Sequence, residues 1–373
     1  MANAPLSSEG ILLYCPHKFL LKCARLMRSL LRQTLTFDRN QPPNWRRALR
    51  VTVAIGLPLF IAIWRGEFLP AVYGGVAGLY SMFVDNGGPT PERIVAIVYM
   101  TVGMLLCGIA GYVGRWVPGA PLAFLLAFSL MAGWLQGTGT SVELMSKYWL
   151  IAFLFGNSDP RLSPLAGTYL LLGGLTGIVS VLIDRVLAGK PEKQFGPMLF
   201  EAISRLLRRR HSNGHFTFYF ASKILAGYAV GYGLGLTRAY WVPLTIAIVT
   251  VYDPQLSIAK LIQRLAGSLL GALVGWAVLT WCHDDTWLAL ISMALGAATA
   301  LLLNRSYWMA VVPITALVMV LLDFGYPQAS TLLAIARVEN TVLGCAIAGL
   351  GALIYLRLQQ WLPRERRKRR ARV

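Results

Sequence analysis

Charged residues are scarce in this chain, and acidic residues are the scarcest among them. The 373 residues include 35 lysines and arginines but only 16 aspartates and glutamates, and charged residues make up 14% of the sequence against 56% hydrophobic residues. Soluble globular domains carry about 25% charged residues. The composition therefore excludes an ordinary soluble protein and indicates a polytopic membrane protein.

The sequence also lacks the motifs of several enzyme and pump classes. It has no GxxxxGK[ST] phosphate-binding loop, which argues against an ATP-driven pump. Its five cysteines form no CxxC pair, and its four histidines stand in expected loops and linkers. This pattern indicates no disulfide framework, no metal site and no Cys–His nucleophile. We therefore expect no cofactor, no bound metal and no enzymatic activity.

The net charge of +19 is concentrated in three basic stretches. They lie at residues 18–50, at residues 185–223 and in the tail PRERRKRRARV, residues 363–373. A basic tail can bind nucleic acid, but basic stretches that flank apolar segments are more typical of cytoplasmic loops held near anionic lipid. We favour the membrane interpretation and expect no nucleic-acid partner.

Apolar runs of the length that crosses a bilayer recur along nearly the whole chain. Glycine, proline and charged residues divide them into two equal sets. The first set covers residues 46–64, 68–84, 93–116, 119–136, 144–156 and 164–187. The second set covers residues 218–236, 240–252, 258–281, 286–303, 307–322 and 335–356. The sequence therefore predicts an all-α integral membrane protein with about twelve transmembrane helices.

The two sets look like copies of one unit. The aligned positions include Arg50 with Lys223, Pro70 with Pro243, and Gly103, Cys107 and Gly111 with Gly267, Gly271 and Gly275. An even number of helices in each copy gives both copies the same orientation in the membrane. We therefore predict two parallel six-helix repeats with a substrate site near the midplane between them.

The repeats and the basic stretches together predict five regions. They are a cytoplasmic basic amphipathic N-terminal region (1–45), a first membrane repeat (46–187), a cytoplasmic basic linker (188–217), a second membrane repeat (218–358) and a basic cytoplasmic tail (359–373). Since cytoplasmic loops carry an excess of lysine and arginine, both termini and the linker are expected in the cytoplasm.

The stretch RAYWVPLTIAIVTVYDPQLSIAKLIQRLAGSLLGALVGW, residues 238–276, is the most specific part of the chain. It joins an aromatic turn with a proline, an acidic-Pro loop, Arg264 and a glycine-spaced helix. With RRALRVTVAIGLPL and VDNGGPTPERI in the first half, it resembles the fusaric acid resistance family over roughly residues 45–360. That family includes bacterial aromatic acid exporters, and plant aluminium-activated malate channels are distantly similar to it.

The resemblance implies a multi-pass protein of the bacterial inner membrane that exports aromatic carboxylates, with a periplasmic adaptor as partner in some members. Larger exporters of this type carry a sizeable cytoplasmic domain after each membrane half. Here only the linker and the short basic tail stand in those places. The chain therefore looks like a compact member.

Cations within the apolar segments are the main candidates for binding an anion. An ionisable side chain costs at least about 2.5–3.5 kcal/mol at the bilayer centre, so its presence there suggests a cavity, a partner or a function. Lys260 and Arg264 are four residues apart and can face one side of a helix, where they could hold a carboxylate. Snorkelling to the cytoplasm and anchoring at the interface are the alternative explanations. The substrate-binding candidates are Arg264, Lys260, Arg50, Lys223, Tyr240, Trp241 and Tyr252.

Two further sets of residues have expected roles. The candidates for proton coupling are Asp253 and Asp85. The glycines expected to pack helices closely, within one copy of the chain or across a dimer, are Gly267, Gly271, Gly275, Gly227, Gly231 and Gly235.

Three functions remain open from the sequence. The first is an exporter of small organic anions, aromatic carboxylates in particular, driven by the proton gradient. The second is a passive anion channel, formed by a homodimer. The third is a non-transporting membrane subunit that docks a periplasmic adaptor. The lipid bilayer is an expected partner in each case.

Overall fold

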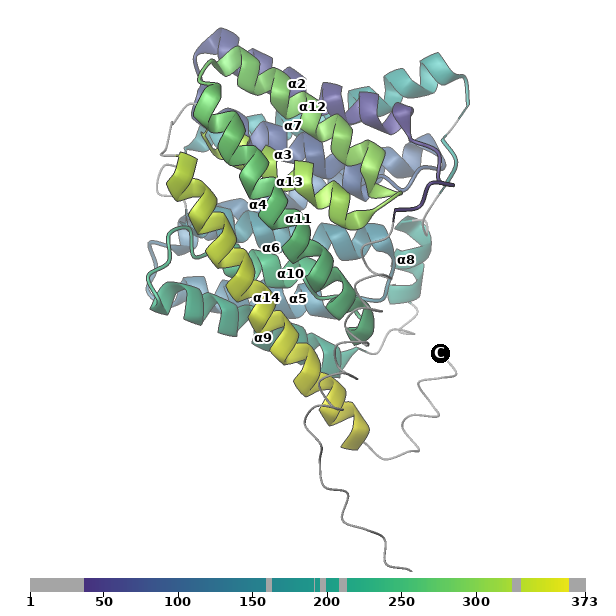
Figure 1. Cartoon of the computed structure of the whole chain (residues 1–373). Coiled ribbons are helices and arrows are strands. Elements are labelled where there is room, and N and C mark those ends of the chain that lie inside the picture. Colours follow the sequence, from purple (N-terminus) through teal and green to yellow (C-terminus); the bar gives the residue numbers. More distant parts are fainter. Residues whose placement is uncertain are drawn as a thin grey trace, which may run out of the picture.

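The computed structural model describes residues 37–158, 163–190, 192–194, 199–207, 213–323 and 330–361. Over these residues the chain forms helices and no strand, which confirms the all-α prediction (Figure 1). The helices are α2 (Trp45–Arg65), α3 (Phe68–Val84), α4 (Thr90–Gly114), α5 (Ala120–Trp134), α6 (Thr140–Ser158), α7 (Pro164–Ala188), α8 (Leu199–Leu207), α9 (Gly214–Gly233), α10 (Trp241–Val249), α11 (Pro254–Trp281), α12 (Asp285–Leu303), α13 (Tyr307–Asp323) and α14 (Ser330–Trp361). The basic tail and most of the N-terminal region lie outside the described residues.

Each of the twelve apolar segments predicted from the sequence coincides with one helix. Within the described residues, six helices are long and apolar enough to cross a membrane, namely α2, α4, α7, α11, α12 and α14. The polytopic membrane class is therefore confirmed, while twelve full crossings remain a prediction. Helix α10 has 9 residues, about 14 Å of helix against a hydrocarbon core of about 30 Å, so it spans only part of the bilayer.

Local polar residues fix several helix ends. The Asn44 side chain accepts a hydrogen bond from the Arg47 backbone N–H at 2.9 Å and begins α2, and Asp284 does the same for Trp287 at 3.0 Å where α12 begins. Gly66 ends α2 in the left-handed region with φ +69°, which glycine adopts without a steric penalty. The loops predicted between apolar segments are therefore built as helix caps and tight turns.

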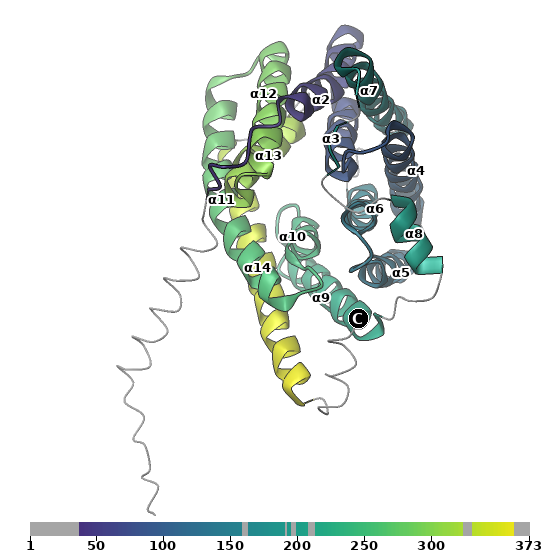
Figure 2. The ribbon, with the colours of Figure 1, turned by 90° about the vertical axis from the view of Figure 1, so that its right-hand side faces the viewer.

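Helices pack in corresponding pairs in the two sets. α4 packs on α6 as α11 packs on α13, and α3 packs on α7 as α10 packs on α14. Between the sets, α2 lies beside α12 and α5 beside α9, so each set contributes equivalent helices to the contact (Figure 2). The inner pairs α3 with α13 and α6 with α10 also correspond. This arrangement agrees with an internal two-fold repeat, although the predicted region boundaries and membrane sides stay predictions.

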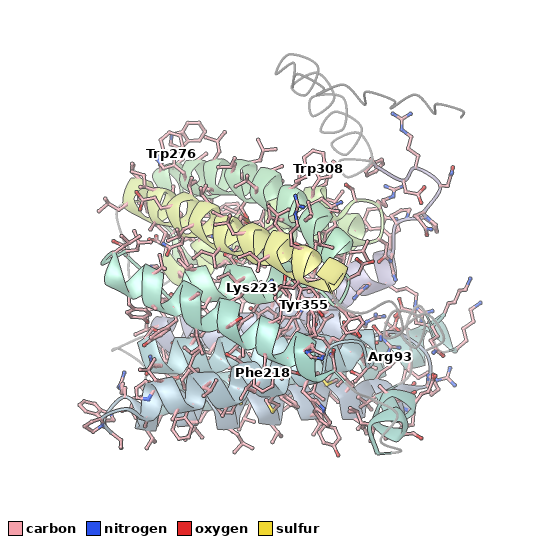
Figure 3. All side chains as sticks on the ribbon, turned by 90° about the horizontal axis from the view of Figure 1, so that it is seen from below. Arg93, Phe218, Lys223, Trp276, Trp308 and Tyr355 are labelled. Carbon is pink, nitrogen blue, oxygen red and sulfur yellow. The ribbon has the colours of Figure 1, made fainter. Side chains whose placement is uncertain are left out.

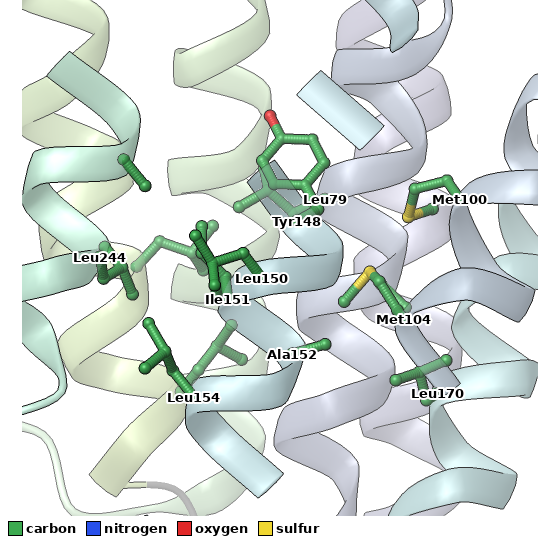
Figure 4. Packing of buried hydrophobic residues seen from close by; sticks show 14 of the residues in the cluster. Leu79, Met100, Met104, Tyr148, Leu150, Ile151, Ala152, Leu154, Leu170 and Leu244 are labelled. Atoms are coloured by element: carbon green, nitrogen blue, oxygen red, sulfur yellow. The ribbon is translucent and has the colours of Figure 1, made fainter. Parts of the chain in front are cut away.

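Helix α6 lies at the centre of the packing. Its buried side chains Leu150, Ile151 and Leu154 lie between Leu244 of α10 and the methionines of α4 (Figure 4). Lipid tails are as apolar as leucine, so close packing rather than removal from water holds such helices together. α6 thereby joins the two sets and supplies one wall of the space between them.

Glycines allow the closest helix contacts. A Cβ atom on Gly267 or Gly271 would lie 2.5 Å from a backbone carbonyl oxygen of α13. Gly275 faces Met319 of α13, while Gly227 and Gly231 face side chains and backbone around α10. Gly235 differs from this packing pattern. It lies in the turn after α9 with φ +64° and no atom near its missing side chain.

The segment predicted as a basic cytoplasmic linker is partly packed on the first set of helices. It contains α8, which contacts α4 and α6, and the Phe200 N–H donates to Glu92 Oε1 at 2.9 Å. Glu192 of the same segment is buried beside α2. The arginines of this linker predict a cytoplasmic segment, but they do not predict the contact of Glu192 with Arg50 of α2.

Candidate anion-binding cavity

A cavity of about 370 Å³ lies between the two sets of helices. Its walls come from α3 and α6 of the first set and from α10 and α13 of the second, with further side chains from α2, α11 and α14. This volume is within the range of about 300–1,000 Å³ seen for small-molecule sites. The cavity therefore lies between the two sets of helices, and its depth in the membrane stays a prediction.

The cavity is lined by cations. They are Arg47, Lys147, Lys260, Arg264 and Arg337. No aspartate or glutamate is among the described residues that line it. Charges buried in proteins are ordinarily paired or hydrogen-bonded, because an isolated charge is costly to desolvate. The cavity thus presents an electrostatic environment suited to an anion.

The cations are distributed along the cavity. Arg47 and Lys260 lie within the first two turns of α2 and α11, which are cytoplasmic ends in the predicted topology. Arg337 lies about two turns into α14, which enters from the opposite side in that topology. Arg264 lies near the Tyr307 hydroxyl and within electrostatic range of Arg337. Positive groups therefore extend from the predicted inner mouth into the far half of the cavity.

Most of these cations are held by neutral groups. The Arg47 Nη2 donates to the Met82 carbonyl at 2.7 Å, and the Lys147 Nζ donates to the Thr250 carbonyl at 2.8 Å. The Arg337 guanidinium lies over the Trp241 ring, 4.8 Å from its centroid. Backbone oxygens and aromatic faces orient Lys147 and Arg337 without neutralising their charge. These two cations therefore stay available to an anion, whereas Arg47 also lies in the field of Asp85 and Glu192.

Aromatic rings form another part of the lining. They belong to Tyr80, Phe83, Tyr148, Phe155 and Tyr307. The rings of Tyr80 and Tyr148 are stacked, with centroids 4.0 Å apart and planes 8° from parallel. Planar aromatic surface beside guanidinium groups suits a ligand that combines a ring with an anionic group.

A second, mostly apolar cavity of about 280 Å³ adjoins the first. It lies among α3, α4, α6 and α7, and both cavities share the side chains of Val72, Val76, Tyr80 and Phe155. Its lining includes Ile109, which is 50% exposed on α4. Tyr80 and Phe155 therefore separate the cationic cavity from an apolar compartment that reaches the outer surface of the helices.

Arg50 does not line the cavity. Its guanidinium donates to Glu192 Oε2 at 2.5 Å, to Asp184 Oδ2 at 3.1 Å and to Asp85 Oδ2 at 3.3 Å. Arg93 donates to both oxygens of Asp85 at 2.8 Å. We call the six residues Arg46, Arg50, Arg93, Asp85, Asp184 and Glu192 the arginine–carboxylate cluster. The cluster holds three cations and three anions, so its formal charge is zero. Its ion pairs connect α2, α4 and α7 with Asp85, the residue that follows α3.

The arginine–carboxylate cluster changes the titration of Asp85. Burial alone would raise the pKa of this carboxyl, but the hydrogen bonds and charge of Arg93, together with the charge of Arg50, outweigh burial and hold the pKa below its usual value. Asp253, in contrast, is exposed in the turn before α11, and its backbone carbonyl accepts from Ser257. Neither proton-coupling candidate faces the cavity.

The remaining candidates lie beside the cavity or away from it. Lys223 is buried behind the cavity wall, where its Nζ donates to Thr250 Oγ1 at 2.9 Å. Trp241 is fully buried beneath Arg337, and the Tyr240 hydroxyl accepts from Arg238 at 3.0 Å. Tyr252 is 48% exposed and packs on Phe216. Of the seven substrate-binding candidates, only Lys260 and Arg264 line the cavity.

Three of the five cavity cations, Arg47, Lys147 and Arg337, are not among the candidates predicted from the sequence. Lys147 and Arg337 stand inside apolar segments, so the cost of a charge at membrane depth marks both as candidates. Arg47 adjoins Arg46 and Arg50, and its sequence position alone does not distinguish it from them. In the structure Arg46 and Arg50 turn to the carboxylates, whereas Arg47 turns to the cavity.

Metal ligands are not clustered in the described part of the chain, which contains no group of three His, Cys, Asp or Glu side chains placed to hold a metal ion. The candidate site is therefore defined by the cavity, its cations and its aromatic rings.

Comparison with known proteins finds similarity in the second half of the chain. Residues 225–351 match the profile described as fusaric acid resistance protein-like. The uncharacterized membrane protein YvaC of Bacillus subtilis is 29% identical over 125 residues, which cover 33% of this chain and 20% of that protein. The uncharacterized protein slr1298 of Synechocystis sp. is 31% identical over 138 residues, which cover 36% of this chain and 18% of that protein.

The matched region spans about a fifth of the length of these relatives, and no solved structure matches the chain. The family match covers α10 to α13, part of α9 and most of α14, and it includes the cavity cations Lys260, Arg264 and Arg337. The chain is therefore a multi-pass membrane protein whose residues 225–351 are similar to the fusaric acid resistance protein-like family.

Proposed function

We propose that the protein transports small organic anions, aromatic carboxylates in particular, through the cavity between its two sets of helices. The observation that carries this proposal is a cavity lined by five cations and, among the described residues, by no carboxylate. An anion that enters would form charge-assisted hydrogen bonds with groups that now contact neutral partners. The setting is the bacterial inner membrane, with both termini in the cytoplasm.

The aromatic lining supports a preference for ring-containing anions. The face of Tyr80 or Tyr148 could stack on a substrate ring while Arg264 or Arg337 holds its carboxylate. Stacking and charge pairing act on different parts of the ligand, so both are needed to favour an aromatic acid over an inorganic anion. The apolar compartment beyond Tyr80 and Phe155 would offer the ring a route out of the cationic cavity.

Uptake into liposomes that contain the purified full chain tests this function. The panel is a set of hydroxybenzoates and aliphatic diacids, offered with and without a pH gradient. Arg264→Ala should reduce the flux of carboxylates at least tenfold, because it removes a buried cation from the site. Arg65→Ala is the matched control, since Arg65 is paired with Glu67 at 3.1 Å and is about half exposed. Equal flux in both variants would contradict a role for the cavity.

A passive anion channel is the second candidate function. The same observation favours it, because the described lining offers no carboxylate to carry a proton. Currents in planar bilayers that reverse at the anion equilibrium potential would support the channel, whereas a fixed ratio of protons to substrate would support a coupled transporter. A homodimer and a periplasmic adaptor are the partners we propose to examine, by cross-linking and by co-purification.

A further inference from the structure

Two buried lysines from different sets of helices bind the same threonine. Lys147 of α6 donates from Nζ to the Thr250 carbonyl at 2.8 Å, and Lys223 of α9 donates from Nζ to Thr250 Oγ1 at 2.9 Å. Both lysines are about 5% exposed, and Thr250, at the end of α10, is fully buried. Lys147 lines the cationic cavity, so the Lys147–Thr250–Lys223 triad connects that cavity to a second buried amine.

The surroundings fix Lys223 in place. Its Nζ also donates to the Tyr219 hydroxyl at 2.8 Å and lies over the Tyr219 ring, 4.0 Å from the centroid. The Tyr219 ring stacks in turn on Tyr355 of α14, with centroids 4.2 Å apart, and Figure 3 shows Lys223 and Tyr355 close together. Gly351 of α14 leaves room for the aliphatic part of Lys223, because a Cβ atom there would overlap it. These contacts hold the Lys223 amine in a buried position, so the side chain does not extend to the membrane surface as a snorkelling lysine would.

Neither lysine has a carboxylate within ion-pair distance among the described residues. The charged groups that act on Lys147 are Lys260 of α11 and Glu143 one turn earlier on α6, and the Glu143 carboxylate accepts from the Gly137 N–H. The charged group that acts on Lys223 is Lys147. α5 and α10, which pack nearby, contain no ionisable side chain. The pair is thus surrounded mainly by like charge and by neutral hydroxyl and carbonyl groups.

We propose that the Lys147–Thr250–Lys223 triad is the proton-coupling site of this transporter. Two ammonium groups on one buried threonine repel each other, so the empty cavity favours one protonated and one neutral amine. An anion beside Lys147 offsets that repulsion, and the neutral amine then takes up a proton. The step is R–X⁻ + Lys–NH₂ + H⁺ → R–X⁻···H₃N⁺–Lys, and release of the anion returns the proton.

This inference rests on the proposed anion transport and adds the site at which that transport is coupled to protons. The anion and the proton move in the same direction, one proton for each monovalent anion, so the complete step carries no net charge. Asp85, held in the arginine–carboxylate cluster, and Asp253, exposed in a turn, take no part in it. Tyr219, which is partly exposed, offers Lys223 a hydroxyl through which protons reach the surface.

The experiment uses benzenesulfonate, which remains an anion at all pH values used and does not cross bilayers as a neutral acid. Liposomes with the full chain and a trapped pH-sensitive dye receive an inward benzenesulfonate gradient. We expect the lumen to acidify with one proton for each benzenesulfonate taken up. In the double variant Lys147→Arg with Lys223→Arg, whose guanidinium groups both stay protonated, no amine remains to take up a proton, so uptake should continue without acidification and become dependent on a compensating potassium current. Lys193→Arg, at an exposed lysine, should behave as the unmodified protein.

Binding to the unmodified protein in detergent gives a second readout that depends on no variant. Benzenesulfonate affinity should fall by up to tenfold per pH unit on the alkaline side of the titration, because binding is linked to uptake of one proton. Uptake of benzenesulfonate with no lumen acidification, or with unchanged acidification in the double variant Lys147→Arg with Lys223→Arg, would overturn the coupling proposal and leave anion transport standing. Absence of flux for every anion in the panel would remove both.

Discussion

Arg50 and Lys223, which the sequence repeat aligns, make opposite kinds of contact. Arg50 is paired with three carboxylates, Glu192 at 2.5 Å, Asp184 at 3.1 Å and Asp85 at 3.3 Å. Among the described residues, Lys223 is bound by the hydroxyls of Tyr219 and Thr250 and by the Tyr219 ring face. One copy of the repeated cation is therefore neutralised within the fold, whereas the amine of the other has no carboxylate partner among the described residues.

The arginine–carboxylate cluster should contribute strongly to stability. Asp85→Asn leaves Arg93 without its bidentate partner, and removal of one member of a buried pair costs about 3–5 kcal/mol. We expect a corresponding loss of free energy of unfolding in detergent at pH 7. Arg65→Ala, which breaks an exposed pair, should cost less than about 1 kcal/mol. Similar losses of unfolding free energy in Asp85→Asn and Arg65→Ala would contradict a strong stabilising role for the arginine–carboxylate cluster.

The same variant predicts a pH dependence. Because the folded pKa of Asp85 lies below its usual value of 3.8, its stabilising contribution is complete above that value and is lost as the pH falls through the folded pKa. The stability difference between the unmodified protein and Asp85→Asn should therefore be constant near neutral pH and shrink below about pH 4. A difference that instead grows on acidification would contradict the lowered pKa.

The glycine contact between α11 and α13 should tolerate no side chain. In Gly271→Leu the new Cβ would lie 2.5 Å from the Val312 carbonyl oxygen and 2.6 Å from Thr315 Cβ. Overpacking of this kind costs about 1–3 kcal/mol or more, so the melting temperature in detergent should fall. Gly233→Ala is the matched control because no atom lies within 4 Å of its missing side chain. An unchanged melting temperature for Gly271→Leu would mean that α11 and α13 are not packed at this seam.

Tyr80 should set the preference for aromatic substrates. It lines both cavities and stacks on Tyr148. Loss of one aromatic contact worth about 0.5–1.5 kcal/mol should lower hydroxybenzoate flux two- to tenfold relative to an aliphatic diacid in Tyr80→Ala. Tyr80→Phe retains the ring and should keep the ratio. A ratio that is unchanged in Tyr80→Ala would argue against stacking as the source of selectivity.

Apolar runs sufficed to predict the helices, because a membrane helix must be apolar along its length and twelve such runs coincide with twelve helices. The glycine spacing likewise predicted close helix contacts at Gly267 and Gly271. Gly235 has the same spacing but follows the helix end, where positive φ and not packing accounts for the glycine. A four-residue spacing places glycines on one helix face only where all of them lie within the same continuous helix.

The site was predicted less completely than the helices. Lys260 and Arg264 were identified because they share one helix face, a relationship that sequence spacing contains. The contacts of Arg50 depend on Asp184 and Glu192, which lie 134 and 142 residues away in sequence. The joining of Lys147 and Lys223 depends on Thr250 in the same way, across 103 and 27 residues. Tertiary contacts of this length decide which cation is neutralised, and no local pattern contains them.

The most direct test of the anion-binding cavity compares two rigid aromatic ions of similar size and opposite charge. Flux of benzenesulfonate and of phenyltrimethylammonium is measured in the same liposomes, for the unmodified protein and for the double variant Arg264→Gln with Arg337→Gln. The cationic lining predicts benzenesulfonate flux at least a hundredfold above that of the cation, and a loss of most of this ratio in the double variant. Equal flux of the two ions through the unmodified protein would contradict an anion pathway through this cavity.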